Sequence, residues 1–458
     1  MALTGSVAAT IPAIHRLRDD ALANTSYLLE VDDGHAVTID PPRDVDRHLE
    51  LAAHLGVQIV ATLDTHVHAD YLSGATELAA RGADAVVPSG AAARFPHRPI
   101  DADEPLAIGE VVLRAIPTPG HTPEHLAYAV EVKGRTEAVF TGGSLIIGGA
   151  ARTDLLGADH TEELARAQFR SLRRLATFPD ATALHPTHGA GSFCLAAAAE
   201  VENPTIGSER ATNPLLQIDD EAAFVEALTR GFGSFPTYYR HLQALNERGP
   251  SLVASLADPP VLSAEEVAKR VAAGAWLVDA RPIHEWATAH PSGAISIEVR
   301  PAFASWLGWS VPFGAPVILI VAEERRGEAL RLARRIGYDD LAFLDGGVDA
   351  WQAAGLPTRS VEEVGAIEAL ERQRSGAVLV DVRQGAELAG ARIPGAVHVE
   401  LGAVIAGATP AGTEVVTFCG HGERSATAAS LLERRGVRVA NLVGGVSAWI
   451  DAELPIER

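Results

Sequence analysis

Residues 65–74 read Thr-His-Val-His-Ala-Asp-Tyr-Leu-Ser-Gly, and they follow an apolar run at 57–63 that predicts a β-strand. A His-x-His-x-Asp pattern on the turn after a strand aims two imidazoles and a carboxylate at one point. Two more histidine-bearing turns, at 118–125 and 184–189, combine glycine or proline with a preceding apolar strand. Three such turns in this order predict a metal site. The candidate metal ligands are His66, His68, Asp70, His121 and His188.

The second half of the chain contains a repeat of about a hundred residues. Leu277–Arg281 and Leu379–Arg383 each join an apolar strand to an Asp-x-Arg pair, and each copy ends in Gly-Gly-Val-x-Ala-Trp. Short β-branched runs alternate with helices rich in alanine, leucine and arginine, as at 425–435. This alternation predicts a parallel sheet with helices on both faces. We interpret the Asp-x-Arg pair as a buried contact that fixes the loop after the strand.

Cys419 opens the loop Cys-Gly-His-Gly-Glu-Arg, which lies between a predicted strand and a helix expected to begin at about Ser425. Helix N-termini, loop N–H groups and a nearby arginine all stabilise a thiolate. Glycines let the backbone turn its N–H groups toward one point. The loop therefore predicts a cysteine that accepts sulfane sulfur as a persulfide, with Cys419 and Arg424 as catalytic residues. The candidate substrate-binding residues are Gly420, His421, Gly422, Glu423 and Ser425.

The corresponding loop of the first copy, Val321–Arg326, contains no cysteine. This copy cannot carry a persulfide, and we expect it to serve as a scaffold or docking surface. The chain has two cysteines in all. We interpret the other one, Cys194, as a buried packing residue, which is the common environment of a lone cysteine.

Two family resemblances follow from these motifs. The Cys-x-x-Gly-x-Arg-Ser loop, set between Asp-x-Arg and Gly-Gly-x-x-x-Trp blocks, resembles the active loop of the rhodanese sulfurtransferases. The order of the histidine turns resembles the metallo-β-lactamase fold, and within it the persulfide dioxygenases in their bacterial form fused to rhodanese domains. The second resemblance covers nearly the whole chain and includes the segments 140–142, 151–155, 188–194, 205–207 and 212–214.

The resemblance implies a multidomain α/β protein, with an αββα metallo-β-lactamase sandwich followed by two rhodanese domains that contain parallel sheets. A polar helical segment, with a helix from about Asp219, separates the sandwich from the repeats. The implied parts are a metallo-β-lactamase-like domain at 1–200, a helical extension and linker at 201–258, an inactive rhodanese-like domain at 259–358, and an active one at 361–458.

In the persulfide dioxygenases a mononuclear ferrous ion is held by two histidines and one aspartate, and the resemblance places His66 and His121 as two of these ligands. The aspartate is expected after Phe-Thr-Gly, where this chain has Gly143. Glycine offers no ligand, so the set would be completed by water, His68, Asp70 or His188, with Asp154 as a more distant candidate. The resemblance therefore implies Fe²⁺ as cofactor, Zn²⁺ as an alternative, and loss of the metal as the third case.

Three functions remain open on this basis. The first is a persulfide dioxygenase that oxidises the persulfide of glutathione or another small thiol to sulfite, coupled to sulfur transfer through Cys419. The second is a sulfurtransferase whose lactamase-type domain has lost its metal and acts as a binding module. The third is a zinc thioester hydrolase. The repeats favour sulfur substrates, either a small thiol persulfide or thiosulfate, over thioesters.

Composition limits the partners. The chain has 458 residues, of which 47% are hydrophobic and 21% charged, as in ordinary globular proteins. Its formal net charge of −21 opposes binding to phosphates, so we expect no nucleic-acid partner. The sequence has no apolar run of about 18 residues and no signal-peptide pattern at its start, so we expect a cytoplasmic protein without a membrane partner. The family resemblance alone implies a homodimer.

Overall fold

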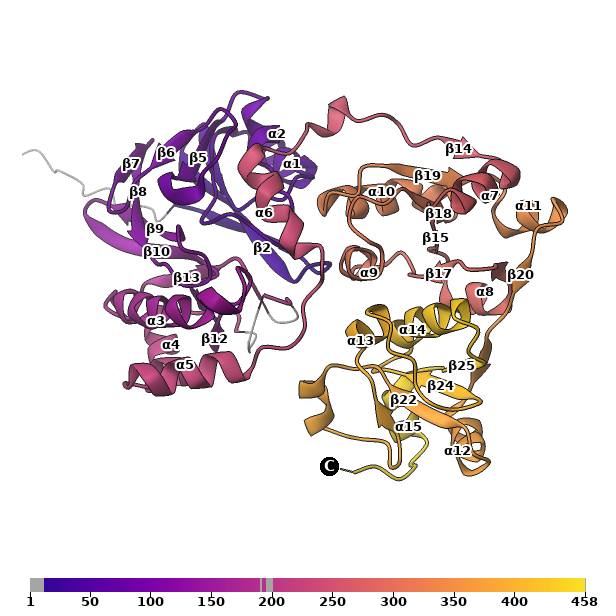
Figure 1. Ribbon diagram of the computed structural model, residues 1–458. Helices are drawn as coiled ribbons and strands as arrows, with labels where there is room; N and C mark the ends of the chain where they lie inside the picture. The colour runs from indigo at the N-terminus through magenta and orange to yellow at the C-terminus, as the bar shows by residue number, and fades with distance from the viewer. Residues whose placement is uncertain (1–11, 190–191, 195–200, 458) are drawn as a thin grey trace, which may run out of the picture. The chain divides into compact units, whose positions relative to one another are not determined.

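The structure is a computed structural model that describes residues 12–189, 192–194 and 201–457 (Figure 1). The first eleven residues, on which the signal-peptide expectation rests, lie outside the described residues. The chain divides into two units, of which the first extends to Phe232 and also includes Tyr239–Leu256, while the second consists of Gly233–Tyr238 and the chain from Ala257 onward. Within the described ranges, no helix combines the length and apolar character needed to cross a membrane.

Two sheets form the centre of the first unit. The first sheet has the strand order β1 (Ile14–Asp19), β2 (Asn24–Asp32), β3 (His35–Ile39), β4 (Gln58–Leu63), β5 (Asp84–Pro88) and β6 (Arg98–Ile100). The second has the order β13 (Ala183–Pro186), β10 (Arg135–Gly142), β9 (Leu126–Val132), β8 (Val111–Pro117) and β7 (Pro105–Ile108). A short hairpin, β11 (Leu145–Ile146) and β12 (Gly149–Ala150), follows β10.

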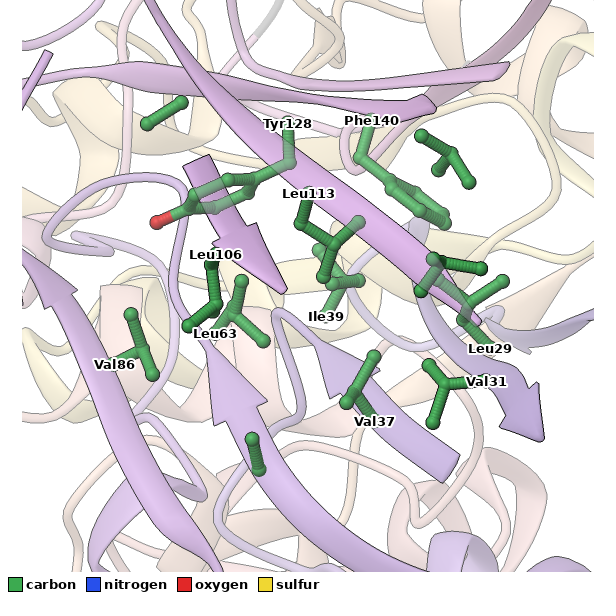
Figure 2. Close-up of a cluster of buried hydrophobic side chains, with 14 of the residues drawn as sticks. Leu29, Val31, Val37, Ile39, Leu63, Val86, Leu106, Leu113, Tyr128 and Phe140 are labelled. Atoms are coloured by element: carbon green, nitrogen blue, oxygen red, sulfur yellow. The ribbon is translucent and has the colours of Figure 1, made fainter. Parts of the chain in front are cut away.

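The core of the first unit lies between these sheets (Figure 2). Leu29 on β2 belongs to the cluster that also contains Tyr128 and Phe140 from the opposite sheet. Its neighbour Leu28 belongs instead to a second cluster, with Ala52 of helix α1 (Asp46–Leu55). Successive residues of a strand point to opposite faces, so β2 buries apolar side chains on both.

Helices cover both outer faces. Helices α1 and α2 (Ala75–Ala79) contribute to the cluster on the first sheet, and α3 (Ala158–Leu175), α4 (Ile206–Thr212) and α5 (Glu221–Arg230) to the cluster on the second. The sandwich is therefore αββα, as the sequence indicated. Helix α5 begins close to its expected start, because the side chain of Asp220 accepts a hydrogen bond from Ala223 N at 2.8 Å. Helix α6 (Tyr239–Arg248) completes this unit.

The second unit contains two parallel five-stranded sheets with equivalent strand orders. The first has the order β14 (Val261–Leu262), β19 (Leu341–Leu344), β18 (Val317–Ile320), β15 (Trp276–Asp279) and β17 (Ile295–Ser296). The second has the order β21 (Glu362–Val364), β25 (Val439–Leu442), β24 (Val415–Phe418), β22 (Val378–Asp381) and β23 (Val397–His398). A small antiparallel pair, β16 (His290–Pro291) and β20 (Thr358–Arg359), belongs to the first copy.

Each copy carries its own helices. Those of the first are α7 (Ala264–Ala272), α8 (Ile283–Thr288), α9 (Phe303–Ser310), α10 (Arg326–Arg335) and α11 (Gly347–Ala353). Those of the second are α12 (Ala366–Arg374), α13 (Leu401–Ile405), α14 (Glu423–Arg434) and α15 (Gly445–Asp451). Helix α7 begins with a reciprocal pair of hydrogen bonds between Ser263 and Glu266, which satisfies two backbone N–H groups at its start.

The Asp-x-Arg pairs are structural, as predicted. Asp381 and Arg383 are both buried, and the guanidinium contacts both carboxylate oxygens, with a closest distance of 2.6 Å. Arg383 also donates to the carbonyl of Ala391 at 2.8 Å, which fixes the loop after β22. In the first copy, Asp279 and Arg281 form the same contacts.

The two copies pack directly against each other. Trp286 of α8 lies in one buried cluster with Ala426 and Ala429 of α14. Thr427, on the same helix, donates a 2.7 Å hydrogen bond to the carbonyl of Ser296 at the end of β17. The copy without a cysteine therefore supports the helix that follows the Cys419 loop.

Candidate metal centre and sulfur-transfer loop

The turn after β4 carries His66, His68 and Asp70, and α6 holds its backbone in place. Asn246 on α6 donates to the carbonyls of His68 and Tyr71, at 2.7 and 2.9 Å. Its side-chain oxygen accepts from the backbone N–H of Ser73 at 2.9 Å. This buried amide therefore fixes the turn through three hydrogen bonds from a segment far away in the sequence.

His66 is oriented by its neighbour. Its Nδ1 lies 2.8 Å from the hydroxyl of Thr65, which donates to the carboxylate of Asp40 at 2.8 Å. The Thr65 hydroxyl uses its single proton in the bond to Asp40. In the bond between Thr65 and His66, the proton is therefore on Nδ1 of His66, and the hydroxyl oxygen accepts it. Nε2 of His66 is left as the lone-pair nitrogen, and no described residue forms a hydrogen bond with it.

His121 and His188 are oriented in the same way. Nδ1 of His121 donates to the carbonyl of Arg152 at 2.7 Å, and Nδ1 of His188 lies 3.0 Å from Oδ1 of Asn24. Asn24 uses its amide nitrogen to donate to Asp70 at 2.6 Å, so its oxygen is the atom that faces His188. A partner on Nδ1 fixes the tautomer that presents Nε2 to a metal.

The ligand atoms of His66, His121 and His188 lie within 4.8 Å of one another. All three side chains are buried, and Nε2 of His188, like that of His66, has no hydrogen-bond partner among the described residues. Burial lowers the pKa of His121 and of His188 to about 3, and it lowers the pKa of His66 well below its usual value. Three neutral, convergent imidazoles, two of which leave Nε2 without a hydrogen-bond partner among the described residues, are suited to a divalent cation.

His68 and Asp70 extend this cluster. Asp70 and His68 form a group with His188 whose ligand atoms also lie within 4.8 Å. Nε2 of His68, however, lies 3.2 Å from the carboxylate of Asp40 and 3.1 Å from the hydroxyl of Tyr71. Burial lowers the pKa of His68, but the carboxylates of Asp40, Asp64 and Asp70 together raise it by more, so the net shift is upward. The structure thus brings all five predicted ligands together, with His68 engaged by Asp40.

Gly143 lies against the histidines at the position where a carboxylate was expected. A Cβ atom at this residue would lie 2.6 Å from Cδ2 of His121 and 3.1 Å from Cδ2 of His188. Its backbone N–H donates to Nε2 of His125 at 3.0 Å. The rings therefore occupy the space that a side chain would need.

We expect Gly143→Asp to lower metal content rather than to restore a ligand, because the new side chain must displace the rings of His121 and His188. Overpacking of this kind costs about 1–3 kcal/mol of stability. The measurements are elemental analysis and the thermal midpoint of the purified protein. Gly143→Ala is the matched control, since it adds the Cβ atom without the carboxylate. More metal in the aspartate variant than in the alanine variant would contradict this expectation.

Cys194 lies near this cluster and is fully buried. Burial raises the pKa of its thiol well above the usual value, with a further contribution from Asp70. Its carbonyl accepts the backbone N–H of Arg152 at 2.8 Å. Ala190 and Gly191, which belong to the motif that precedes it, lie outside the described residues.

We expect Cys194→Ser to leave sulfur transfer by Cys419 within about twofold of the unchanged protein, since a buried neutral thiol is a poor nucleophile. The measurement is the rate of persulfide-dependent sulfur transfer to an acceptor thiol. A loss of more than tenfold in a variant with an unchanged thermal midpoint would assign Cys194 a role as a sulfur relay.

The Cys419 loop closes around its own sulfur. The backbone N–H of Gly422 donates to Sγ at 3.1 Å, and the hydroxyl of Ser425 donates to it at 3.7 Å. Helix α14 begins at Glu423, two residues before the expected start, because Gly422 precedes it with a φ of 111°. Gly445 packs beneath the loop, since a Cβ atom there would lie 2.3 Å from the carbonyl oxygen of Cys419.

Charged residues surround this loop. Arg424 forms a two-pronged ion pair with Glu387, with N–O distances of 2.6 and 2.7 Å. Arg300, from the copy without a cysteine, lies 3.4 Å from Glu423. His421 is exposed, whereas Cys419 is completely buried. Glu387 and Arg300 have no motif around them, and sequence reasoning missed both.

Comparisons with known proteins cover both halves of the chain. The rhodanese-like domain family matches residues 263–354 and 366–452. The hydroxyacylglutathione hydrolase of Anaeromyxobacter dehalogenans is 32% identical, over 43% of this chain and 82% of that protein. The mitochondrial persulfide dioxygenase of Homo sapiens is 28% identical, over 43% of this chain and 72% of that protein.

A solved structure matches most of the length of the chain. The crystal structure of a metallo-β-lactamase from Staphylococcus aureus subsp. aureus COL superposes with a TM-score of 0.67 and 25% identity. The match covers 73% of this chain and 99% of that one, so it extends beyond the αββα sandwich. The chain belongs to the metallo-β-lactamase-fold proteins, in a form fused to two rhodanese-like domains, and its relatives include a persulfide dioxygenase.

Proposed function

We propose that this protein is a persulfide dioxygenase coupled to a sulfurtransferase, in which Cys419 accepts sulfane sulfur and the histidine cluster holds the metal for persulfide oxidation. The observation that carries the proposal is the Cys419 loop, in which Gly422 N–H, Ser425 and Arg424 all face one sulfur. Donors of this kind stabilise the negative charge that a sulfur nucleophile needs. The loop lies in a domain of the rhodanese-like family, which supports sulfur as its substrate.

The transfer step is balanced without an added oxidant. The Cys419 thiolate attacks the terminal sulfur of a persulfide R–S–SH, and a new S–S bond forms. The original S–S bond breaks, and R–S⁻ leaves with the electron pair and takes up a proton from water. The cysteine persulfide then passes its sulfur to an acceptor thiol in the same manner.

The proposed metal ligands are His66, His121 and His188. A ferrous ion bound there would supply open positions for a persulfide sulfur and for dioxygen. The chain's own contribution is orientation, because Thr65, Arg152 and Asn24 each hold one ring.

A zinc thioester hydrolase is the second candidate. The similarity to a hydroxyacylglutathione hydrolase supports it, and three histidines also form the ligand set of catalytic zinc in carbonic anhydrase. The sulfur-accepting loop in the same chain favours the dioxygenase, because thioester hydrolysis needs no persulfide chemistry.

Metal content and oxygen uptake test the proposal together. We expect about one iron per chain in protein purified without chelators, with oxygen consumed and sulfite formed from glutathione persulfide. Zinc, with hydrolysis of a glutathione thioester and no oxygen uptake, would instead establish the hydrolase. Absence of both metals, with Cys419 still active, would leave a sulfurtransferase alone.

A further inference from the structure

Both arginines at the sulfur-transfer loop are already neutralised by carboxylates. Arg424 is held by both oxygens of Glu387, and Arg300 lies beside Glu423. The side chain of Arg424 is 18% exposed, so this pair is only partly screened by water. The loop therefore offers an incoming donor no unpaired positive charge among these residues.

Glu387 is fixed by contacts that do not involve Arg424. It lies on the short helix η5 (Gly385–Ala389), where one of its oxygens also accepts the backbone N–H of Gln384 at 2.9 Å. Glu400 accepts the N–H of Gly385 at 2.8 Å and the hydroxyl of Ser234 at 3.0 Å. These contacts hold the Glu387 carboxylate in place at the edge of the Cys419 loop.

Arg424 is shared between this carboxylate and the reactive sulfur. Burial lowers its pKa, but Glu387 and the sulfur of Cys419 raise it by more, so the net shift is upward. Because the guanidinium of Arg424 also contacts the sulfur of Cys419, a donor that reaches Sγ comes close to the Arg424–Glu387 pair. The charge that the donor carries next to its terminal sulfur then determines how strongly this pair attracts or repels the donor.

We propose that Glu387 is a specificity-determining residue that makes the loop accept sulfur from organic persulfides in preference to thiosulfate. This inference rests on the proposed sulfurtransferase function. In thiosulfate the terminal sulfur is bonded directly to a sulfonate, and breaking the S–S bond releases sulfite, which carries two negative charges. An organic persulfide releases a thiolate with one. Glu387 repels the departing sulfite more strongly than the departing thiolate. It also occupies the guanidinium of Arg424, which would otherwise bind the sulfonate oxygens of thiosulfate.

The test compares two donors in the full-length protein. The probes are thiosulfate and the persulfide of 2-mercaptoethanol, which has no other charged group. We expect the unchanged protein to favour the persulfide in kcat/KM. Glu387→Gln should raise kcat/KM for thiosulfate at least about tenfold and change that for the persulfide by less than about threefold. Glu387→Asp, which keeps the charge, should retain the preference for the persulfide.

Glu371→Gln is the matched control, since this exposed carboxylate lies on α12 of the same copy. This substitution should leave kcat/KM unchanged for both donors. Equal use of both donors by the unchanged protein, or an equal change for both in Glu387→Gln, would overturn the assignment of Glu387. Transfer from neither donor would overturn the sulfurtransferase function itself, and with it this inference.

Discussion

Cys419→Ser is expected to reduce persulfide-dependent sulfur transfer by more than about 10³-fold, because a serine hydroxyl at neutral pH is not ionised and cannot carry a persulfide. Serine has nearly the shape of cysteine and keeps the donors Gly422 N–H and Ser425 as neighbours. The fold should therefore survive the change. The measurement is transfer of sulfur from a small persulfide to an acceptor thiol, followed in a single turnover and at steady state.

Cys194→Ser is the matched control for this experiment, since it removes the only other thiol. Mass spectrometry of the protein after incubation with the donor gives an independent result. One added sulfur should be found on the unchanged protein and on the Cys194 variant, and none on the Cys419 variant. Full transferase activity in Cys419→Ser would show that another group carries the sulfur.

His188→Ala is expected to remove most of the bound metal, because it deletes one of three convergent ligand nitrogens. Loss of groups that merely orient a ligand already weakens metal binding about 10–100-fold, so loss of the ligand should cost at least that much. Elemental analysis of purified protein, together with titration of metal into chelator-treated protein, measures the effect.

His160→Ala is the control, since His160 is exposed on α3. Asn24→Ala should weaken binding by a smaller factor, because His188 would keep its nitrogen and lose only the amide that orients it. Sulfur transfer by Cys419 should be unchanged in all three variants. Unchanged metal content in His188→Ala would assign the third ligand position to Asp70 or to water.

The histidine turns could be predicted from sequence because each is a local pattern after an apolar strand. His66, His121 and His188 come together since their strands end at the same edge of the αββα sandwich, and this arrangement follows from a fold that the motif order indicated. The parallel sheets of the two copies were also predictable, because Leu379–Val380 and their counterparts Leu277–Val278 are continuous apolar residues, which the structure shows as buried strands.

The remaining parts of the site have no local signal. Asn24, Asp40 and Asn246 are ordinary polar residues in the sequence, and they act only because the fold brings them to the histidine turns. Glu387 lies more than thirty residues from Arg424, on a helix too short to show a periodic pattern. The early start of α14 has a similar origin, since Gly422 adopts a backbone conformation that most residues avoid.

The packing of α14 against the other copy bears on how such a chain evolves. His290 of the copy without a cysteine lies 3.0 Å from Glu433, and Trp286 packs on the same helix. After a duplication, one copy can lose its cysteine, but these contact residues should stay under selection because they support the helix that follows the Cys419 loop. In the copy without a cysteine, sequence change should therefore be fastest around Val321–Arg326 and slowest at the residues that contact α14.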